Sequence, residues 1–157
     1  MKGGPAPGTD GWWVLWIDGG ARGNPGPAGA GAVLHDPSGR RAAAQAFPLG
    51  RTTNNDAEYA GLIHGLGMAR EAGARRVEVR SDSELLVRQM TGEYRIRAPH
   101  LQEAAARARE LVQGFADIRF TAIPRTANRE ADRLANRAMD DVKGVRPAPG
   151  PGGMVRS

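Results

Sequence analysis

Asp18 is a carboxylate at a position where a folded chain seldom tolerates an unpaired charge. It follows residues 12–17, the most apolar run in the sequence, and it precedes two glycines. Burying an ionised carboxylate costs several kcal/mol unless a cation or hydrogen-bond donors compensate the charge. Asp18 therefore predicts a cation partner, and an ordinary turn aspartate at a strand end is the alternative.

Glu58 poses a similar choice on a helical pattern. It lies three residues after Asn55, a spacing that suits a capping box at a helix start. It also shares a helix face with the two glycines and two leucines of residues 61–66, the stripe expected to pack on a sheet. A carboxylate at the buried end of such a stripe is more often a ligand than a solvated side chain, and we interpret Glu58 in this way.

Two further aspartates fall at the ends of predicted elements. Asp82 stands between Ser81 and Ser83, where an N-cap is the local interpretation and where ligands of α/β sheets also gather. Asp132 falls near the start of the last predicted helix, where acidic residues offset the helix dipole. Four carboxylates at one sheet edge repel one another unless cations hold them. Oxygen donors alone suit Mg²⁺ or Mn²⁺, and two Mg²⁺ ions would balance the four charges.

The composition bounds the class of protein. The chain has 157 residues, 40% of them hydrophobic, which fits one domain. It has no cysteine, which excludes a disulfide framework, a cysteine-ligated zinc site and a cysteine nucleophile. The net charge of +5 suits an anionic partner, although an arginine-rich proteome would give the same count. No apolar run approaches the roughly 20 residues of a membrane span, and no secretory signal is recognised, so we expect a cytoplasmic protein without membrane contact.

The hydrophobic periodicities predict the element order βββαβααβα, a mixed sheet flanked by helices in the α/β class. The expected strands are residues 12–17, 29–35, 41–47, 76–81 and 117–123, and the expected helices are residues 55–72, 84–90, 101–113 and about 127–140. Residues 11–141 are predicted to form the domain. Gly- and Pro-rich tails, expected to be flexible, flank it at residues 1–10 and 142–157.

Four short strings carry a family resemblance. They are Asp18-Gly19 with Gly23-Asn24-Pro25-Gly26-Pro27, then Thr53-Asn54-Asn55-Asp56-Ala57-Glu58-Tyr59, then Ser81-Asp82-Ser83, and finally Asn128-Arg129-Glu130-Ala131-Asp132. Over about residues 12–140 the chain resembles the type I ribonuclease H family, in the prokaryotic form without a basic protrusion. The resemblance implies a ribonuclease H-like fold with a five-stranded mixed sheet, three antiparallel strands followed by two parallel ones. It also implies an endonuclease that hydrolyses the RNA strand of RNA/DNA hybrids with two divalent metal ions, leaving 5′-phosphate and 3′-hydroxyl ends.

The same resemblance assigns roles to individual residues. Asp18 would bridge both metal ions, and Asp132 would hold the ion that activates water. Glu58 and Asp82 would hold the ion on the leaving-group side. Contacts to RNA 2′-hydroxyls would come from Gly20, Gly23, Asn24, Asn54 and Asn55. Thr53 matches a position that touches a DNA phosphate, and we expect one of the two adjacent asparagines also to cap the helix.

Three features depart from the family pattern. Many members of the family carry an amide that contacts RNA at the position of Glu84. The resemblance therefore does not predict an RNA contact for Glu84. Arg125 lies in the loop where many members carry a histidine thought to help release product. We assign Arg125 an electrostatic role in catalysis, because a guanidinium stays charged at neutral pH. Residues 91–99 stand in place of the longer basic protrusion of some bacterial members.

Two alternatives stay open at this point. A 3′–5′ exonuclease would share the four acids, but such enzymes carry two carboxylates on the first strand, and Gly20 occupies the second position here. A non-catalytic RNA/DNA hybrid-binding module would also fit, because sequence does not show that the site is assembled. We expect a monomer. His35, His64 and His100 fall outside the motifs, and we interpret them as surface or partly packed side chains.

Overall fold

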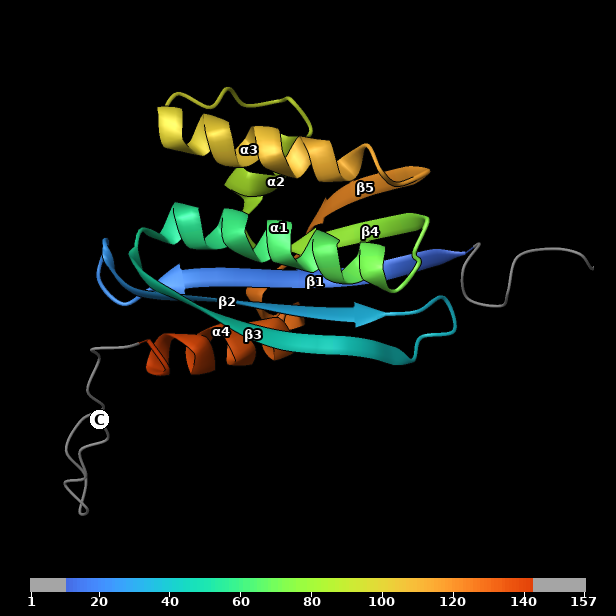
Figure 1. Ribbon diagram of the computed structural model, residues 1–157, viewed down its shortest axis with the longest axis horizontal. Coiled ribbons are helices and arrows are strands. Elements are labelled where there is room, and N and C mark those ends of the chain that lie inside the picture. The colour runs from blue at the N-terminus through green and yellow to red at the C-terminus, as the bar shows by residue number, and fades with distance from the viewer. Residues whose placement is uncertain (1–10, 143–157) are drawn as a thin grey trace, which may run out of the picture.

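The computed structural model describes residues 11–142, which form a five-stranded sheet with helices on both faces (Figure 1). The strands are β1 (Trp12–Ala21), β2 (Gly26–His35), β3 (Arg41–Thr52), β4 (Arg76–Ser81) and β5 (Asp117–Ala122). The helices are α1 (Asn54–Glu71), α2 (Glu84–Met90), α3 (Pro99–Val112) and α4 (Arg129–Asp140), with a 3₁₀ turn, η1 (Arg125–Ala127), before α4. The predicted element order and the α/β class are confirmed.

The sheet has the order β3-β2-β1-β4-β5, with β1 at its centre. β1, β2 and β3 pair antiparallel, whereas β4 pairs parallel with both β1 and β5, as the family resemblance implies. The first three strands are longer than predicted. β1 continues past Ile17 because it keeps pairing with β2 as far as Ala21, opposite Ala28. Strand β3 accommodates Pro48 because it lies at the edge of the sheet, where one side needs no ladder hydrogen bonds.

Helices α1 and α4 cover opposite faces of the sheet (Figure 1). Gly61 lies on the buried face of α1, where a Cβ atom would come within 2.8 Å of Asp18 O. On the other face, a Cβ atom at Gly31 would lie 2.4 Å from Ala131 O in α4. The glycines therefore let both helices rest directly against the strands, as the glycine-containing stripe of α1 predicts.

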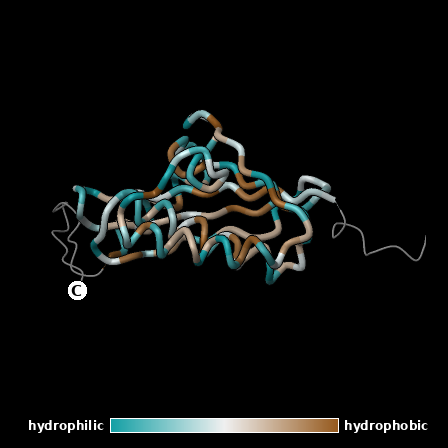
Figure 2. The backbone as a smooth tube through the Cα atoms, turned by 90° about the horizontal axis from the view of Figure 1, so that it is seen from above, coloured by the Kyte–Doolittle hydropathy of each residue, from teal (hydrophilic) through white to brown (hydrophobic). Residues whose placement is uncertain are grey.

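The main hydrophobic core lies between the sheet and the helices α1 and α3. Its fully buried members include Leu15, Ile17, Leu62, Leu66 and Val79. Figure 2 shows the same apolar character along the middle strands of the sheet. Burying each such side chain stabilises the fold by about 1.5–3 kcal/mol. The core thus supplies a rigid frame for the polar residues at the ends of the strands.

Three helices begin at different residues from those predicted, and for α1 the difference is a single residue. α3 begins at Pro99 rather than residue 101, because proline suits the first turn of a helix, where its missing N–H would have no partner. α4 begins at Arg129 rather than near residue 127, because Asn128 leaves the helical conformation with φ −118° and ψ 32°. Asn128 thereby separates η1 from α4.

The packed part of the chain ends later than predicted. Val142, which the sequence assigns to the C-terminal tail, lies just after the end of α4 and is only 3% exposed. The tails expected at residues 1–10 and 143–157 lie outside the described residues. Within residues 11–142, none of the helices combines the length and the apolar character that crossing a membrane would require.

Candidate active site

Asp18 lies inside β1 and not at its end, so the predicted strand end is wrong. The strand continues because Gly19 can lie against α1, where a Cβ atom would come 2.3 Å from Ala57 O. The register partner of Asp18 on β2 is Gly31, which packs on α4. The central strand therefore carries this partly buried carboxylate between the two helices that cover the sheet.

Glu58 lies near the start of α1 and takes no part in capping this helix. The N-cap is Thr53, whose backbone is extended and whose hydroxyl accepts a hydrogen bond from Asp56 N–H at 3.1 Å. The capping-box alternative for Glu58 is therefore wrong, as is the expectation that an asparagine caps α1. Instead, the Ser83 hydroxyl donates to Glu58 Oε1 at 3.1 Å and links α1 to the turn after β4.

Asp82 follows β4 directly and does not cap α2. Ser83 is the N-cap, because its hydroxyl accepts from Leu86 N–H at 3.2 Å, so the capping interpretation of Asp82 is wrong. Asp82 Oδ2 instead accepts from Asn128 Nδ2 at 3.0 Å, and the same amide donates to Ile17 O at 2.8 Å. Sequence reasoning missed this role of Asn128, since its partner Ile17 lies 111 positions away along the chain.

Asp132 lies one turn into α4, and its N–H donates to Asn128 O at 3.0 Å. Asn136, one turn further on, donates from Nδ2 to Asp132 O at 3.0 Å. Arg22, from the β1–β2 connection, donates to Asn136 O at 3.2 Å and pairs with Asp140. Sequence reasoning missed both Arg22 and Asn136. The i,i+4 spacing between Asp132 and Asn136 was a signal for one of them, whereas the contacts of Arg22 form only between distant segments.

The carboxylates at this end of the sheet perturb one another. The pKa of Asp18 is raised to about 8, first by burial, then by the charge of Asp82 and a hydrogen bond with Asp132. The pKa of Glu58 is raised to about 7, mainly by burial, and the positive charge of Arg125 lowers it only in part. Ionising Asp18 and Glu58 is therefore unfavourable without a partner, and a bound cation would offset that cost.

An open cleft of about 470 Å³ joins these groups. It is lined by Asp18, Gly19, Gly20, Ala21, Arg22, Asn54, Glu58, Arg125, Asp132, Asn136 and Met139. Three of the predicted ligands thus share one cleft, and Asp82 influences two of them electrostatically. Arg125 reaches the same cleft from η1, at the place expected from the sequence.

The donors in the cleft fit hard divalent cations. The candidate ligands are carboxylate oxygens, which Mg²⁺ and Mn²⁺ prefer. Among the residues that the structure describes, no three His, Asp or Glu side chains lie close enough together to hold one metal ion as they stand. Three of the carboxylates instead line an open cleft. Such an arrangement suits ions that keep water molecules and substrate phosphates among their ligands.

Two of the predicted substrate residues, Gly20 and Asn54, line the cleft, and the others lie in the adjoining loop and at the start of α1, a set that we call the rim. Asn24 Oδ1 accepts from Asn54 N–H at 3.0 Å, and Asn54 Oδ1 accepts from Ala21 N–H at 2.7 Å. Gly23, in the same loop, has φ +93°, a conformation that favours glycine. Asn55 is exposed, and its side chain forms no hydrogen bond with another residue of the described range. The rim is thus tied together by Asn24 and Asn54, while Asn55 presents its amide to the surroundings.

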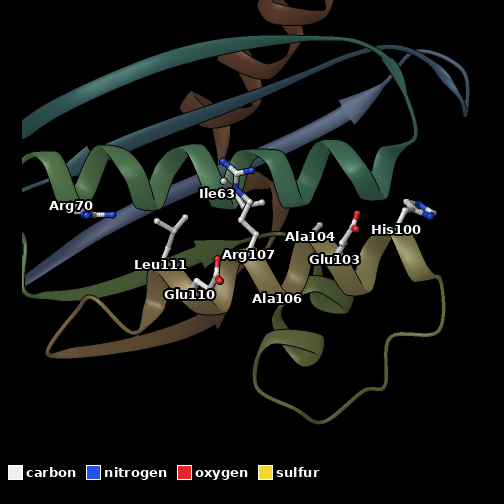
Figure 3. Close-up of a pocket in the computed structure, with 9 residues that line it drawn as sticks. All are labelled: Ile63, Arg70, His100, Glu103, Ala104, Ala106, Arg107, Glu110 and Leu111. Carbon is white, nitrogen blue, oxygen red and sulfur yellow. The ribbon is translucent and has the colours of Figure 1, made fainter.

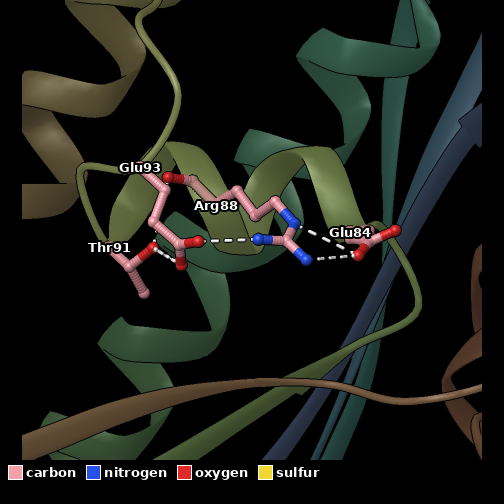
Figure 4. Close-up of polar contacts among 4 residues, drawn as sticks. All are labelled: Glu84, Arg88, Thr91 and Glu93. Carbon is pink, nitrogen blue, oxygen red and sulfur yellow. Dashed lines mark hydrogen bonds and ion pairs between the residues drawn. The ribbon is translucent and has the colours of Figure 1, made fainter.

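Glu84 is held by an arginine one turn further along α2. Arg88 donates to Glu84 Oε2 from Nε (3.1 Å) and from Nη2 (2.8 Å), and from Nη1 to Glu93 Oε1 at 2.6 Å (Figure 4). Thr91 also donates to Glu93, at 3.0 Å. The charge of Glu84 is therefore paired within α2 and its following turn. This pairing accommodates an acidic residue two positions after Asp82.

Known proteins are similar to this chain over most of its length. Residues 17–138, a range that contains all four carboxylates, match the family described as Reverse transcriptase-like. Ribonuclease HI of Halobacterium salinarum is 45% identical over 127 residues, which cover 81% of this chain and 64% of that protein. The chain therefore spans slightly less than two thirds of the length of this relative.

Two solved structures are similar in fold and in sequence. RNase H1 from Halobacterium salinarum has a TM-score of 0.81 and 44% identity, covering 84% of this chain and 100% of that chain. LC11-RNase H1, solved in complex with an RNA/DNA hybrid, has a TM-score of 0.78 and 42% identity, covering 82% and 96% of the two chains. The likeness thus extends across the sheet and the cleft.

Proposed function

Because the chain belongs to the type I ribonuclease H family, we propose that it is an endonuclease that hydrolyses the RNA strand of RNA/DNA hybrids. The observation that carries the proposal is the placement of four carboxylates from separate elements at one end of the sheet, three of them in one cleft and the fourth within electrostatic range. They are Asp18, Glu58, Asp82 and Asp132. The solved hybrid complex of LC11-RNase H1, at 42% identity, supports the same substrate class for this chain.

Two divalent ions, Mg²⁺ or Mn²⁺, are the proposed cofactors. Asp18 would be shared between them, and Asp132 would hold the ion on the side of the attacking water. Glu58 and Asp82 would hold the ion on the leaving-group side. When bound, such a pair activates water and stabilises negative charge on the leaving oxygen of an in-line displacement. The raised pKa values of Asp18 and Glu58 support this assignment, because a cation would favour their ionised forms.

The protein itself contributes fixed geometry and local charge. The packed strands hold Asp18 and Asp82, and the Ser83 hydroxyl orients Glu58. Arg125 adds positive charge beside the cleft, where it would attract phosphate. Cleavage of the bond between phosphorus and the 3′ oxygen would leave 5′-phosphate and 3′-hydroxyl ends.

Selection of the hybrid is assigned to the rim of the cleft. Its contacts to RNA 2′-hydroxyls in the minor groove would come from Gly20, Gly23, Asn24, Asn54 and Asn55. Asn24 and Asn54 bond to the loop backbone, so part of their role would be to hold its shape. Thr53 would contact a phosphate of the DNA strand in addition to capping α1.

A cleavage assay on a labelled RNA/DNA hybrid with Mg²⁺ tests this function. We expect internal cuts in the RNA strand with 3′-hydroxyl ends, and no cleavage of matched DNA and RNA duplexes. Stepwise shortening from the 3′ end would indicate an exonuclease instead. An intact hybrid that is retarded on a native gel would indicate a binding module.

We further propose that the protein acts as a monomer in the cytoplasm. Light scattering after size-exclusion chromatography measures the first of these predictions, for which a mass near 16.7 kDa is expected. Cell fractionation measures the second.

A further inference from the structure

Asn128 is a buried amide that joins elements carrying three of the carboxylates. It is 1% exposed and lies between η1 and α4. Its Nδ2 donates to Ile17 O (2.8 Å) and to Asp82 Oδ2 (3.0 Å), while its backbone O accepts from Asp132 N–H (3.0 Å). Because Ile17 directly precedes Asp18, this one residue contacts the chain at or beside three proposed metal ligands.

The contacts of Asn128 define the orientation of its amide. Both Nδ2 hydrogens have oxygen acceptors, and exchanging nitrogen and oxygen would place Oδ1 against those two oxygens. Within residues 11–142, Oδ1 has no hydrogen-bond partner. The side chain also forms no capping hydrogen bond to α4. The amide therefore serves β1 and Asp82 and not the helix that it precedes.

We propose that Asn128 is a positioning residue that holds Asp18, Asp82 and Asp132 in place for divalent cations. The inference rests on the proposed function, because it takes these carboxylates as metal ligands. Like charges at one edge of a sheet push one another apart, and a hydrogen bond donated to Asp82 offsets part of that repulsion. The bond to Ile17 O at the same time keeps β1 beside the start of α4. Loss of such a supporting hydrogen bond typically weakens metal affinity by about 10- to 100-fold.

Calorimetric titration with Mn²⁺ in the absence of nucleic acid tests the inference. The variants are Asn128→Ala, which removes both donors, and Asn128→Ser, which keeps a small polar side chain. Gln89→Ala is the matched control, because Gln89 is another buried amide (6% exposed) whose side chain bonds to the Tyr59 hydroxyl at 2.8 Å and not to a carboxylate. We expect both Asn128 variants to bind Mn²⁺ about ten-fold or more weakly than the wild type. The control should lose thermal stability and keep its affinity.

Circular dichroism shows which variants fold, and Asn128→Ser carries the test where Asn128→Ala does not fold. Wild-type affinity in a folded Asn128 variant would overturn the inference, as would equal weakening in Gln89→Ala or the absence of Mn²⁺ binding by the wild type. Weakened binding in the Asn128 variants alone supports it. A wild type that binds Mn²⁺ and leaves hybrids uncut would overturn the proposed function and not the role of Asn128.

Discussion

Two hollows on the protein surface differ in whether their charged side chains compensate one another. The larger, a groove of about 770 Å³ between α1 and α3, is lined by side chains of both signs, with Arg107 between Glu103 and Glu110 along α3 (Figure 3). The smaller is the cleft of about 470 Å³ at the end of β1. There, Asp18 and Glu58 are partly buried and face further negative charge.

The charge balance of the two hollows, and not their size, therefore distinguishes the candidate active site from the groove. Exposed charges of alternating sign at helical spacing compensate one another and are screened by water. In the cleft, burial raises the pKa values of Asp18 and Glu58, and the charge of Asp82 adds a smaller increase to both. A ligand that brings positive charge therefore gains far more in the cleft than in the groove.

Neutralising one acid in each hollow should affect hybrid cleavage very differently, and this is the largest effect that we expect. Asp18→Asn is expected to lower hybrid cleavage by about 10³-fold and to keep hybrid binding, because the amide retains the shape of the side chain and loses the charge. Glu110→Gln, the matched change in the groove, should leave turnover within about two-fold of the wild type. Mg²⁺-dependent turnover and gel retardation measure both effects. Turnover near the wild-type value in Asp18→Asn would contradict the assignment of the metal site.

The metal-free protein should lose stability as the pH rises. The pKa of Asp18 is about 8 in the folded protein against an ordinary 3.8, and that of Glu58 is about 7 against 4.5. Between these values the folded state binds more protons than the unfolded state. The free energy of unfolding should therefore decline from about pH 4 to about pH 8, by several kcal/mol in total. Urea unfolding in a buffer with chelator measures the decline, and added Mg²⁺ should reverse it.

The two acid-to-amide variants sharpen this pH experiment. The free energy of unfolding of Asp18→Asn should decline less steeply with pH than that of the wild type. Without metal, this variant should also be more stable than the wild type near neutral pH, because one repelling charge is gone. Glu110→Gln should keep the wild-type slope, since its side chain is exposed in the groove. A wild-type stability that stays level or rises over this range would show that the cleft charges are compensated after all.

Arg125 tests whether a cation of the protein itself corrects part of the imbalance in the cleft. An exposed charge interaction of about 1 kcal/mol corresponds to a change in rate of about five-fold. Arg125→Ala should lower turnover by this amount, and Arg125→Lys should restore part of it. The pH–rate profile of Arg125→Lys should keep the wild-type shape, because the substitution keeps a positive charge beside Glu58. Unchanged steady-state turnover in Arg125→Ala would remove this residue from the site.

The smallest effects are expected at the rim of the cleft. Asn54→Ala should destabilise the protein by about 1 kcal/mol, because it removes the acceptor of Ala21 N–H. Asn55→Ala should change stability by less than about 0.5 kcal/mol. It should nevertheless reduce the preference for hybrid over duplex DNA, which fluorescence anisotropy with both ligands measures. Equal losses of affinity for hybrid and DNA in Asn55→Ala would argue against a role in recognising RNA.

The framework of the protein could be predicted from its sequence because hydrophobic periodicity reports burial. Residues 12–17 are apolar on both faces, and they do form the first part of the central strand. Gly61 and Gly65 do lie on the face of α1 that packs on the sheet. The strings around the four carboxylates were sufficient to indicate the family, since each combines local backbone requirements with a charged residue at an element end.

The pairing of the polar groups, in contrast, depends on contacts that form when the chain folds. At both helix starts the sequence offers adjacent side chains that can cap, and the folded chain uses Thr53 and Ser83. Asp82 is thereby left to Asn128, which also reaches Ile17 O across 111 positions of the chain. A cap contributes about 1 kcal/mol, so two neighbouring capping candidates differ in free energy by less than this amount. Contacts between distant segments are therefore enough to decide which of them caps the helix. A local pattern does not encode those contacts, because they exist only once the sheet and α4 have packed together.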